Sequence, residues 1–128
     1  RDYEYTPSTS SLQILKQQKV PLYDRSKYSS ERIEIKSRDG TLIPVSLVYR
    51  KDLIDKKKTN PLHLYGYGSY EISIDPEFAT TRLPLLDRGV IFAIAHVRGG
   101  GEMGRTWYES AKYSNKARTF TDFIDCAN

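Results

Sequence analysis

Apolar and polar residues alternate at period two in four short segments of the first half of the chain. Residues 3–5 and 12–14 flank the turn-rich segment 6–11, and residues 32–36 and 44–49 flank an Asp-Gly pair. Such alternation is typical of half-buried strands, and Asp-Gly between two of them is a strong hairpin signal. The pattern therefore predicts two antiparallel hairpins, joined by a polar, Pro-containing connector.

The pattern changes in the second half of the chain. Residues 62–65 and 90–97 are short apolar runs with little alternation. Runs of this kind are typical of strands buried on both faces in a parallel sheet. Between them, residues 78–87 have apolar positions compatible with a helix that is broken near Pro84 and stopped by Gly89.

Two capping-box patterns predict helices near the end of the chain. The pattern from Thr106 to Glu109 opens a short helix, and the pattern from Thr119 to Asp122 leads into apolar residues at helical spacing. The resulting order of strands and helices is an α/β plan, in which a further parallel strand should follow the last helix. No strand follows before Asn128, and the start lacks both Met and an apolar leader, so we expect an incomplete domain.

The composition is that of a globular chain with a modest positive charge. The 128 residues carry 20 Lys and Arg against 16 Asp and Glu, and residues 1–60 hold the excess, with 13 against 8. The Lys-rich segment 50–58 is more typical of a solvated loop than of a nucleic-acid site, which would interleave cations with aromatics on one face. No apolar run reaches the ~18 residues of a membrane span. Neither nucleic acid nor a membrane is therefore an expected partner.

The chain contains a single cysteine, Cys126, and two histidines, His63 and His96. A lone cysteine forms no intramolecular disulfide, which favours a reducing compartment and hence the cytoplasm. Cys and His do not cluster at metal-ligand spacing, so neither a metal nor another cofactor is expected.

Gly99, Gly101 and Gly104 match the spacing of the dinucleotide-binding fingerprint and follow a predicted strand. In that fingerprint an acidic residue ends the next strand about 20 residues later. Asp122 lies at this distance, but in a helix-start pattern and with no strand predicted before it. We therefore favour the alternative that the glycines let two backbone segments cross closely, and keep nucleotide binding as a minor hypothesis.

A complete catalytic triad is not visible in the sequence. Nucleophilic catalysis needs an activated hydroxyl or thiol, a base and an orienting group. Ser69 does not lie in a Gly-x-Ser-x-Gly elbow, because Tyr67 stands where the first glycine is required. His96 closes an apolar strand and is expected in the core, and His63 has no acid beside it.

Asp75 and Glu77 flank a proline in a loop-like segment. Residues two apart in an extended chain face the same way, so this pair suits a cationic ligand. A solvated loop is the alternative explanation.

Several motifs occur in a characteristic order along the chain. They are Leu64–Tyr70 followed by Ser73-Ile74-Asp75, then His96–Gly104, Trp107-Tyr108 and Thr119–Phe123, with upstream segments at residues 30–32 and 38–47. Together they resemble the prolyl oligopeptidase family of serine peptidases, from about Tyr3 to the last residue. Gly68-Ser69-Tyr70, where prolyl oligopeptidase itself has Gly-Gly-Phe, makes the chain more similar to the oligopeptidase B branch.

The resemblance implies an α/β-hydrolase catalytic domain with a seven-bladed β-propeller over its active site. Residues 1–18 would then be the last propeller strands, residues 19–30 the linker, and residues 31–128 the N-terminal part of the hydrolase domain. The nucleophile, base and acid of the family would all lie beyond this chain, so the segment alone is expected to be inactive.

The resemblance also implies roles for four residues. Tyr67 matches the tyrosine whose hydroxyl donates to the oxyanion, and Asp75, Glu77 and Tyr70 match substrate-binding positions. The implied parent is a serine-type oligopeptidase that cleaves short basic peptides after Lys or Arg through an acyl-enzyme. Its partners within the protein would be the rest of the catalytic domain and the propeller. A non-catalytic remnant or interaction module is the alternative.

Overall fold

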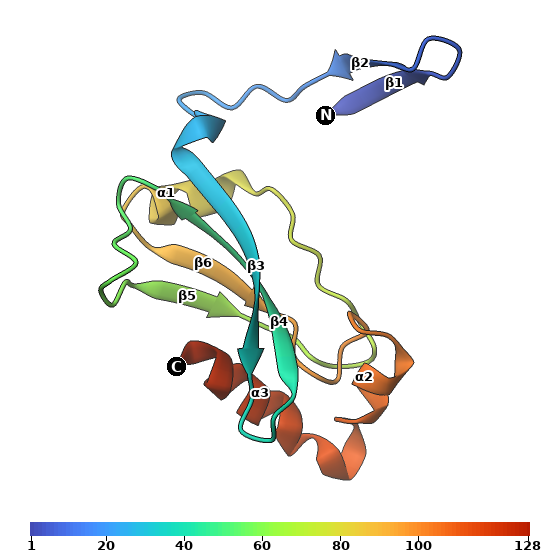
Figure 1. Cartoon of the computed structure of the whole chain (residues 1–128), viewed down its shortest axis with the longest axis vertical. Coiled ribbons are helices and arrows are strands. Elements are labelled where there is room, and N and C mark those ends of the chain that lie inside the picture. The colour runs from blue at the N-terminus through green and yellow to red at the C-terminus, as the bar shows by residue number, and fades with distance from the viewer.

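The computed structural model describes all 128 residues and contains two separate sheets. In Figure 1 an N-terminal hairpin stands apart from a four-stranded sheet that has short helices around it. The strands are β1 (Asp2–Thr6), β2 (Ser11–Lys16), β3 (Tyr28–Lys36), β4 (Leu42–Arg50), β5 (Leu62–Tyr65) and β6 (Ile91–Ala95). The helices are α1 (Leu83–Leu86), α2 (Arg105–Glu109) and α3 (Ala117–Ala127), with 3-10 turns at Arg25–Lys27, Thr80–Arg82 and Tyr113–Asn115. None of these helices has the length and apolar character that crossing a bilayer requires.

Strands β1 and β2 form the first predicted hairpin, with Tyr5 opposite Leu12 in an antiparallel pair. All side chains of both strands are exposed, the apolar ones included. A two-stranded hairpin without a covered face is marginally stable in water. The hairpin therefore gains little stability from burial within this chain.

Strands β3 and β4 form the second predicted hairpin around Asp39-Gly40. Strand β3 begins at Tyr28, inside the stretch that the polar pattern assigns to a connector. Strand β3 is an edge strand that pairs with β4 from Tyr28 onward, and its polar side chains find partners outside the strand. The Tyr28 hydroxyl donates to Asp87 at 2.6 Å, and the Tyr49 hydroxyl donates to Glu31.

Strands β5 and β6 are parallel, as predicted, in a sheet of order β3-β4-β6-β5. Phe92 to Ala95 of β6 are buried. The expectation that β5 is also buried on both faces is wrong, because Leu62, His63 and Tyr65 are exposed. Strand β5 lies at the edge of the sheet and pairs only with β6, so its second edge is open.

The helix predicted over residues 78–87 is reduced to a 3-10 turn and the single α-turn of α1. Pro84 stands in the first turn of α1, where its missing N–H costs no hydrogen bond. It therefore begins this helix rather than breaking it. Gly89, with a φ of 79°, follows the end of the turn as predicted.

Both capping-box predictions place the helix start too late. Helix α2 begins at Arg105 and α3 at Ala117, so Thr106 and Thr119 lie inside first turns, and neither helix has a side-chain cap. The Thr119 hydroxyl instead donates to the carbonyl oxygen of Arg98 at 2.7 Å. The Thr119 hydroxyl thus makes a tertiary hydrogen bond in place of a local helix cap.

The core has two parts, one on each face of the larger sheet. On one face, buried residues of β4, β6 and the segment after β6 pack beneath α3, namely Ile43, Val45, Ala93, Ala95 and Val97, with Trp107 and Phe123 against them. The opposite face has the smaller cluster of Leu86, Phe92 and Ile94. Beside it lies an open cavity of about 510 Å³, whose walls include Tyr23 and Phe78.

Candidate functional site

The segment Gly66–Tyr70 leaves the carboxyl end of β5 and carries Tyr67. The glycines on both sides of Tyr67 pack tightly. A Cβ on Gly66 would lie 2.9 Å from the Phe123 ring, and one on Gly68 would overlap side chains of α3 and of the segment after β6. Gly68 also has a φ of 65°, which a side chain would strain. The backbone beside Tyr67 is thus fixed, while the Tyr67 side chain is 42 % exposed.

Two consecutive residues after Ser69 hold left-handed backbone conformations. Tyr70 has a φ of 54° and Glu71 a φ of 59°, a region that costs a non-glycine residue roughly 1–3 kcal/mol. The Glu71 N–H donates to the carbonyl oxygen of Gly99 at 3.2 Å, and the Arg105 guanidinium contacts the Glu71 carboxylate at 2.5 Å. The glycine loop and α2 therefore hold a strained turn, and strain of this kind is concentrated at functional sites.

The glycine loop after β6 is filled by protein atoms. A Cβ on Gly99 would overlap the carbonyl oxygen of Gly68, and a Cβ on Gly101 would overlap that of Glu71. A phosphate site needs free N–H groups facing an open space, whereas carbonyl oxygens face these glycines. Asp122 lies in α3 and not at the end of a strand. The glycines serve a close backbone crossing, and the geometry of the dinucleotide fingerprint is not formed.

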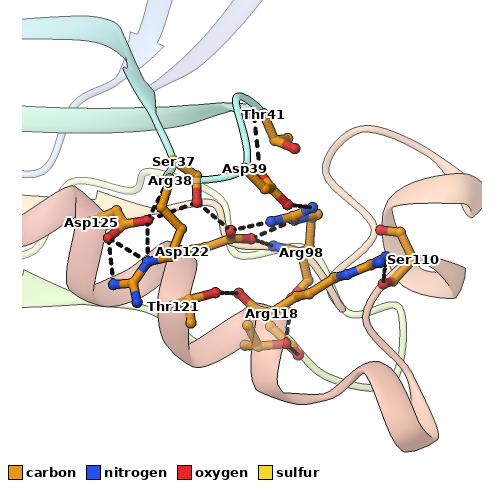
Figure 2. A network of polar contacts seen from close by, with 12 residues as sticks. Ser37, Arg38, Asp39, Thr41, Arg98, Ser110, Arg118, Thr121, Asp122 and Asp125 are labelled. Carbon is orange, nitrogen blue, oxygen red and sulfur yellow. Dashed lines mark hydrogen bonds and ion pairs between the residues drawn. The ribbon is translucent and has the colours of Figure 1, made fainter.

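Figure 2 shows a polar network beside this loop, centred on Arg98 and Asp122. Asp122 is fully buried and accepts from Arg98 Nε at 2.8 Å, from the Arg98 backbone N–H at 3.2 Å and from Ser37 Oγ at 3.1 Å. Asp39, from the β3–β4 turn, contacts the same guanidinium at 2.7 Å. The network joins the β3–β4 turn, the segment after β6 and α3.

Charge pairing shifts the pKa values of Arg98, Asp39 and Asp125 in and beside this network. Hydrogen bonding to Asp122 and then to Asp39 raises the pKa of Arg98 in spite of its burial. The Arg98 guanidinium, together with a backbone N–H, lowers the pKa of Asp39 to about 2. Arg38 holds the pKa of Asp125 well below its usual range through side-chain and backbone hydrogen bonds. The loops that meet here are therefore fixed relative to one another.

Asp75 and Glu77 are both exposed and form no ion pair with the chain. The segment that carries them is anchored at both ends. The Ile74 N–H donates to Glu102 Oε1 at 3.1 Å, and Arg82 Nη1 donates to the carbonyl oxygen of Glu77 at 2.5 Å. Glu77, but not Asp75, lies in the wall of the 510 Å³ cavity. The two carboxylates are available to a cation from outside the chain.

Tyr70 is 78 % exposed and shares the strained turn with Glu71. The backbone thus joins Tyr67, Tyr70 and the start of the acidic segment in one continuous stretch after β5. No helix or strand separates them, since the stretch from Gly66 to Ala79 is irregular.

The histidines do not meet Ser69. His96 is buried, as predicted, with its Nε2 at 2.9 Å from Ser46 Oγ and its Nδ1 at 3.7 Å from Glu102 Oε1. These three groups have the order of a catalytic triad, but only 2 % of His96 is exposed, so a substrate does not reach the ring. His63 lies on β5 and packs edge-on against Phe92.

The Lys-rich loop is largely neutralised by neighbouring carboxylates. Lys56 pairs with Glu31 at 2.9 Å, and Lys58 pairs with Asp55 at 3.4 Å. Paired, solvated cations fit the loop interpretation of this segment better than a nucleic-acid surface.

Comparison with known proteins places these features in a family. A model described as the prolyl oligopeptidase family matches residues 76–128. Dipeptidyl aminopeptidase BI of Pseudoxanthomonas mexicana is 56% identical over 124 residues. Oligopeptidase B of Trypanosoma brucei with covalently bound antipain superposes with a TM-score of 0.87 at 51% identity. The chain belongs to the prolyl oligopeptidase family.

The match to these prolyl oligopeptidase relatives extends over nearly the whole chain but over a small part of each relative. The alignments cover 96% of the chain and 17% of the dipeptidyl aminopeptidase, and 98% of the chain and 18% of the Trypanosoma protein. Oligopeptidase B of Leishmania major gives a TM-score of 0.86 at 48% identity with the same coverage. The chain thus spans less than a fifth of the length of these relatives.

The sequence analysis missed three residues that hold this part of the fold together. Arg98 carries the central network, Glu102 anchors the acidic segment, and Lys116 contacts the loop of Tyr67. Arg98 and Glu102 flank the glycine run, so their position offered a signal. Lys116 had none, because its contacts lie 47 and 48 residues away along the chain.

Proposed function

We propose that this chain is part of a serine peptidase that cleaves short peptides after Lys or Arg through an acyl-enzyme. The observation that carries the proposal is the fixed, strained loop that presents the Tyr67 side chain at the carboxyl end of β5. A phenol held in this way is suited to donate a hydrogen bond to a developing oxyanion, because a preorganised donor pays no reorganisation cost during the reaction.

In this proposal the nucleophile, the base and the orienting acid come from parts of the protein outside these residues. Residues 1–18 are the last strands of a propeller, residues 19–30 the linker and residues 31–128 the start of the hydrolase domain. The exposed apolar side chains of β1 and β2 support a neighbouring domain that covers them. With Cys126 as its one cysteine, the chain suits the cytoplasm.

The preference for basic peptides is supported by two exposed carboxylates on the irregular segment that follows Tyr67 along the chain. Asp75 and Glu77 lack ion-pair partners, and we assign them to the position that binds the residue before the cleaved Lys or Arg, with Tyr70 beside them. The degree of similarity also supports this branch. Identity is 48% and 51% with two oligopeptidases B, but 34% with the prolyl endopeptidase of Elizabethkingia meningoseptica.

The test of Tyr67 uses the full-length protein. Tyr67→Phe should lower kcat for an Arg-Arg amide substrate by about 10²–10³-fold, the usual loss for one oxyanion donor, with little change in KM. Tyr65→Phe is a matched control, because Tyr65 is equally exposed and lies two residues earlier on β5. Full amidase activity in the Tyr67→Phe variant would reduce Tyr67 to a packing residue.

Labelling separates the peptidase from a non-catalytic module. The full-length protein should react stoichiometrically with an active-site serine reagent, whereas the 128-residue chain should not react and should not cleave peptides. Absence of labelling in a folded full-length protein would favour the non-catalytic alternative.

A further inference from the structure

Lys116 lies at the start of α3, and its ammonium group reaches across to the loop that carries Tyr67. Lys116 Nζ donates to the carbonyl oxygen of Gly68, to Ser69 Oγ at 2.7 Å and to Thr119 Oγ1 at 3.2 Å. The side chain is half-buried. Three polar atoms therefore surround the three N–H bonds of one ammonium.

The direction of these hydrogen bonds follows from counting hydrogens. The single hydroxyl hydrogen of Thr119 goes to the carbonyl oxygen of Arg98 at 2.7 Å, so Thr119 Oγ1 accepts from Lys116. The carbonyl oxygen of Gly68 can only accept. Lys116 therefore donates its hydrogen bonds to acceptors that the fold holds in place. This is the pattern of a charged lysine that stabilises a loop, and not of a base that takes a proton from Ser69.

Lys116 has no carboxylate partner, unlike Lys112 and Lys56. Lys112, four residues earlier, contacts Glu109 at 3.4 Å, and Lys56 contacts Glu31 at 2.9 Å. Partial burial lowers the pKa of Lys116, and no negative charge offsets this effect. An unpaired, partly buried cation is costly, so its position requires a compensating gain from its hydrogen bonds.

Lys116 holds the peptide between Gly68 and Ser69, one residue beyond Tyr67. Gly68 has a φ of 65°, and its carbonyl oxygen also lies against Gly99. A rotation of this peptide would displace Gly68, and through Gly68 it would shift the backbone of Tyr67 and redirect the phenol. A hydrogen bond from a cation is roughly twice as strong as one between neutral groups, so Lys116 opposes this rotation strongly.

We propose that Lys116 is a positioning residue that fixes the Gly66–Tyr70 loop so that the Tyr67 hydroxyl points at the oxyanion. The inference rests on the proposed function, since it assigns Lys116 a role only through Tyr67. It predicts that the contribution of Lys116 to the reaction disappears when the Tyr67 hydroxyl is absent.

The test is a double-mutant cycle in the full-length protein, with Arg-Arg amide substrate and separate kcat and KM. Lys116→Met keeps the length of the side chain and removes all three donors. It should lower kcat by about 10–100-fold at nearly constant KM, the loss expected for a misplaced catalytic group. Lys112→Met is the matched control and should change kcat by less than about 2-fold, because Lys112 pairs only at the surface.

The Tyr67→Phe background decides how Lys116 acts. There, Lys116→Met should lower kcat by less than about 3-fold, because residues that work through one another are not additive. An equal loss in both backgrounds would overturn the proposal, and so would unchanged activity of Lys116→Met beside an impaired Tyr67→Phe. If Tyr67→Phe itself keeps full activity, the proposed oxyanion role of Tyr67 fails instead.

A second measurement addresses the loop without using activity. Hydrogen exchange of the amides of Glu71 and Ile72, which close the strained turn, should be faster in Lys116→Met than in Lys112→Met. Ser69→Ala removes one acceptor, leaves the charge in place and should give a smaller effect of the same kind. Unchanged exchange in a folded Lys116→Met protein would show that Lys116 does not hold the loop.

Discussion

Replacing Asp122 with Asn should destabilise the region around α3 more than any other single change of charge in the chain. The substitution keeps the size of the side chain and removes its charge. Asp122 is 0 % exposed and accepts from the Arg98 backbone N–H, from Arg98 Nε and Nη2, and from Ser37 Oγ. An amide would turn its own N–H groups toward these donors, and Arg98 would keep only Asp39, whose side chain is 41% exposed.

The magnitude follows from this geometry. Removal of one partner of a buried ion pair costs about 3–5 kcal/mol. Asp39 still compensates part of the Arg98 charge, so we expect the lower end, about 3 kcal/mol. A loss of that size corresponds to about 100-fold faster exchange of amides that open together with this region.

The assay is hydrogen exchange of peptides from residues 117–127 in the full-length protein. Glu109→Gln is the control, because Glu109 pairs with Arg105 at the surface, with 47 % of its side chain exposed. Exposed pairs contribute less than about 1 kcal/mol, so exchange should change by less than about 5-fold in the control. Equal exchange in the Asp122→Asn and Glu109→Gln variants would refute the claim that the buried pair holds α3 in place.

Three further predictions concern backbone space, acid stability and thiol reactivity. Gly68→Ala should destabilise the loop of Tyr67 much more than Gly104→Ala in unfolding measurements, because both residues have positive φ but only Gly68 lacks space for a methyl group. The pKa of Asp39 is lowered to about 2, so the stabilising effect of its carboxylate should be complete above the ordinary pKa of 3.8 and should disappear as the pH falls through 2. The free energy of unfolding of Asp39→Asn, measured across this pH range, should therefore depend less on pH than that of the unsubstituted protein. Burial raises the pKa of Cys126 from 9.0 to about 11, so iodoacetamide should label it about 100-fold more slowly at pH 8 in the native protein than in urea, as read by mass spectrometry.

Substitution of both acidic residues tests substrate preference. Asp75→Asn with Glu77→Gln should raise KM for Arg-Arg substrates about 10-fold, because charge-assisted hydrogen bonds to a cation contribute about 1.5–3 kcal/mol. Substrates with an uncharged residue before the cleaved Arg should be nearly unaffected, and equal losses on both substrates would mean that the pair supports the fold.

The strands were predictable from the sequence because their signals are local. Alternation around Asp39-Gly40 needs only neighbouring residues, and the apolar run of residues 90–97 is long enough to indicate a central strand. The exposure of β5 was not predictable in the same way, because Leu62–Tyr65 reads as apolar whether or not a second strand covers it. Whether an edge strand is buried depends on which other segment packs beside it.

The helix starts and the support of the candidate site depended on contacts between distant segments. Thr119 has the local pattern of a cap, but its hydroxyl bonds to Arg98, 21 residues earlier. Lys116 lies in a segment with no motif of its own, and only the fold brings it to Gly68. The sequence therefore marked the loop of Tyr67 as a candidate site, but it did not indicate which residues support that loop.

The open edge of β5 has a consequence for how an active site is assembled around Tyr67. A strand that joins β5 in the same direction would bring its own carboxyl end next to Gly66, because parallel strands end at the same side of a sheet. The distance between Tyr67 and any residue after that strand would then be set by the pairing register of main-chain hydrogen bonds. A slip of one residue would move that neighbour by about 3.3 Å and turn its side chain to the opposite face. Main-chain hydrogen bonds between the two strands would therefore align Tyr67 with the residue after the neighbouring strand, before any side chain contributes.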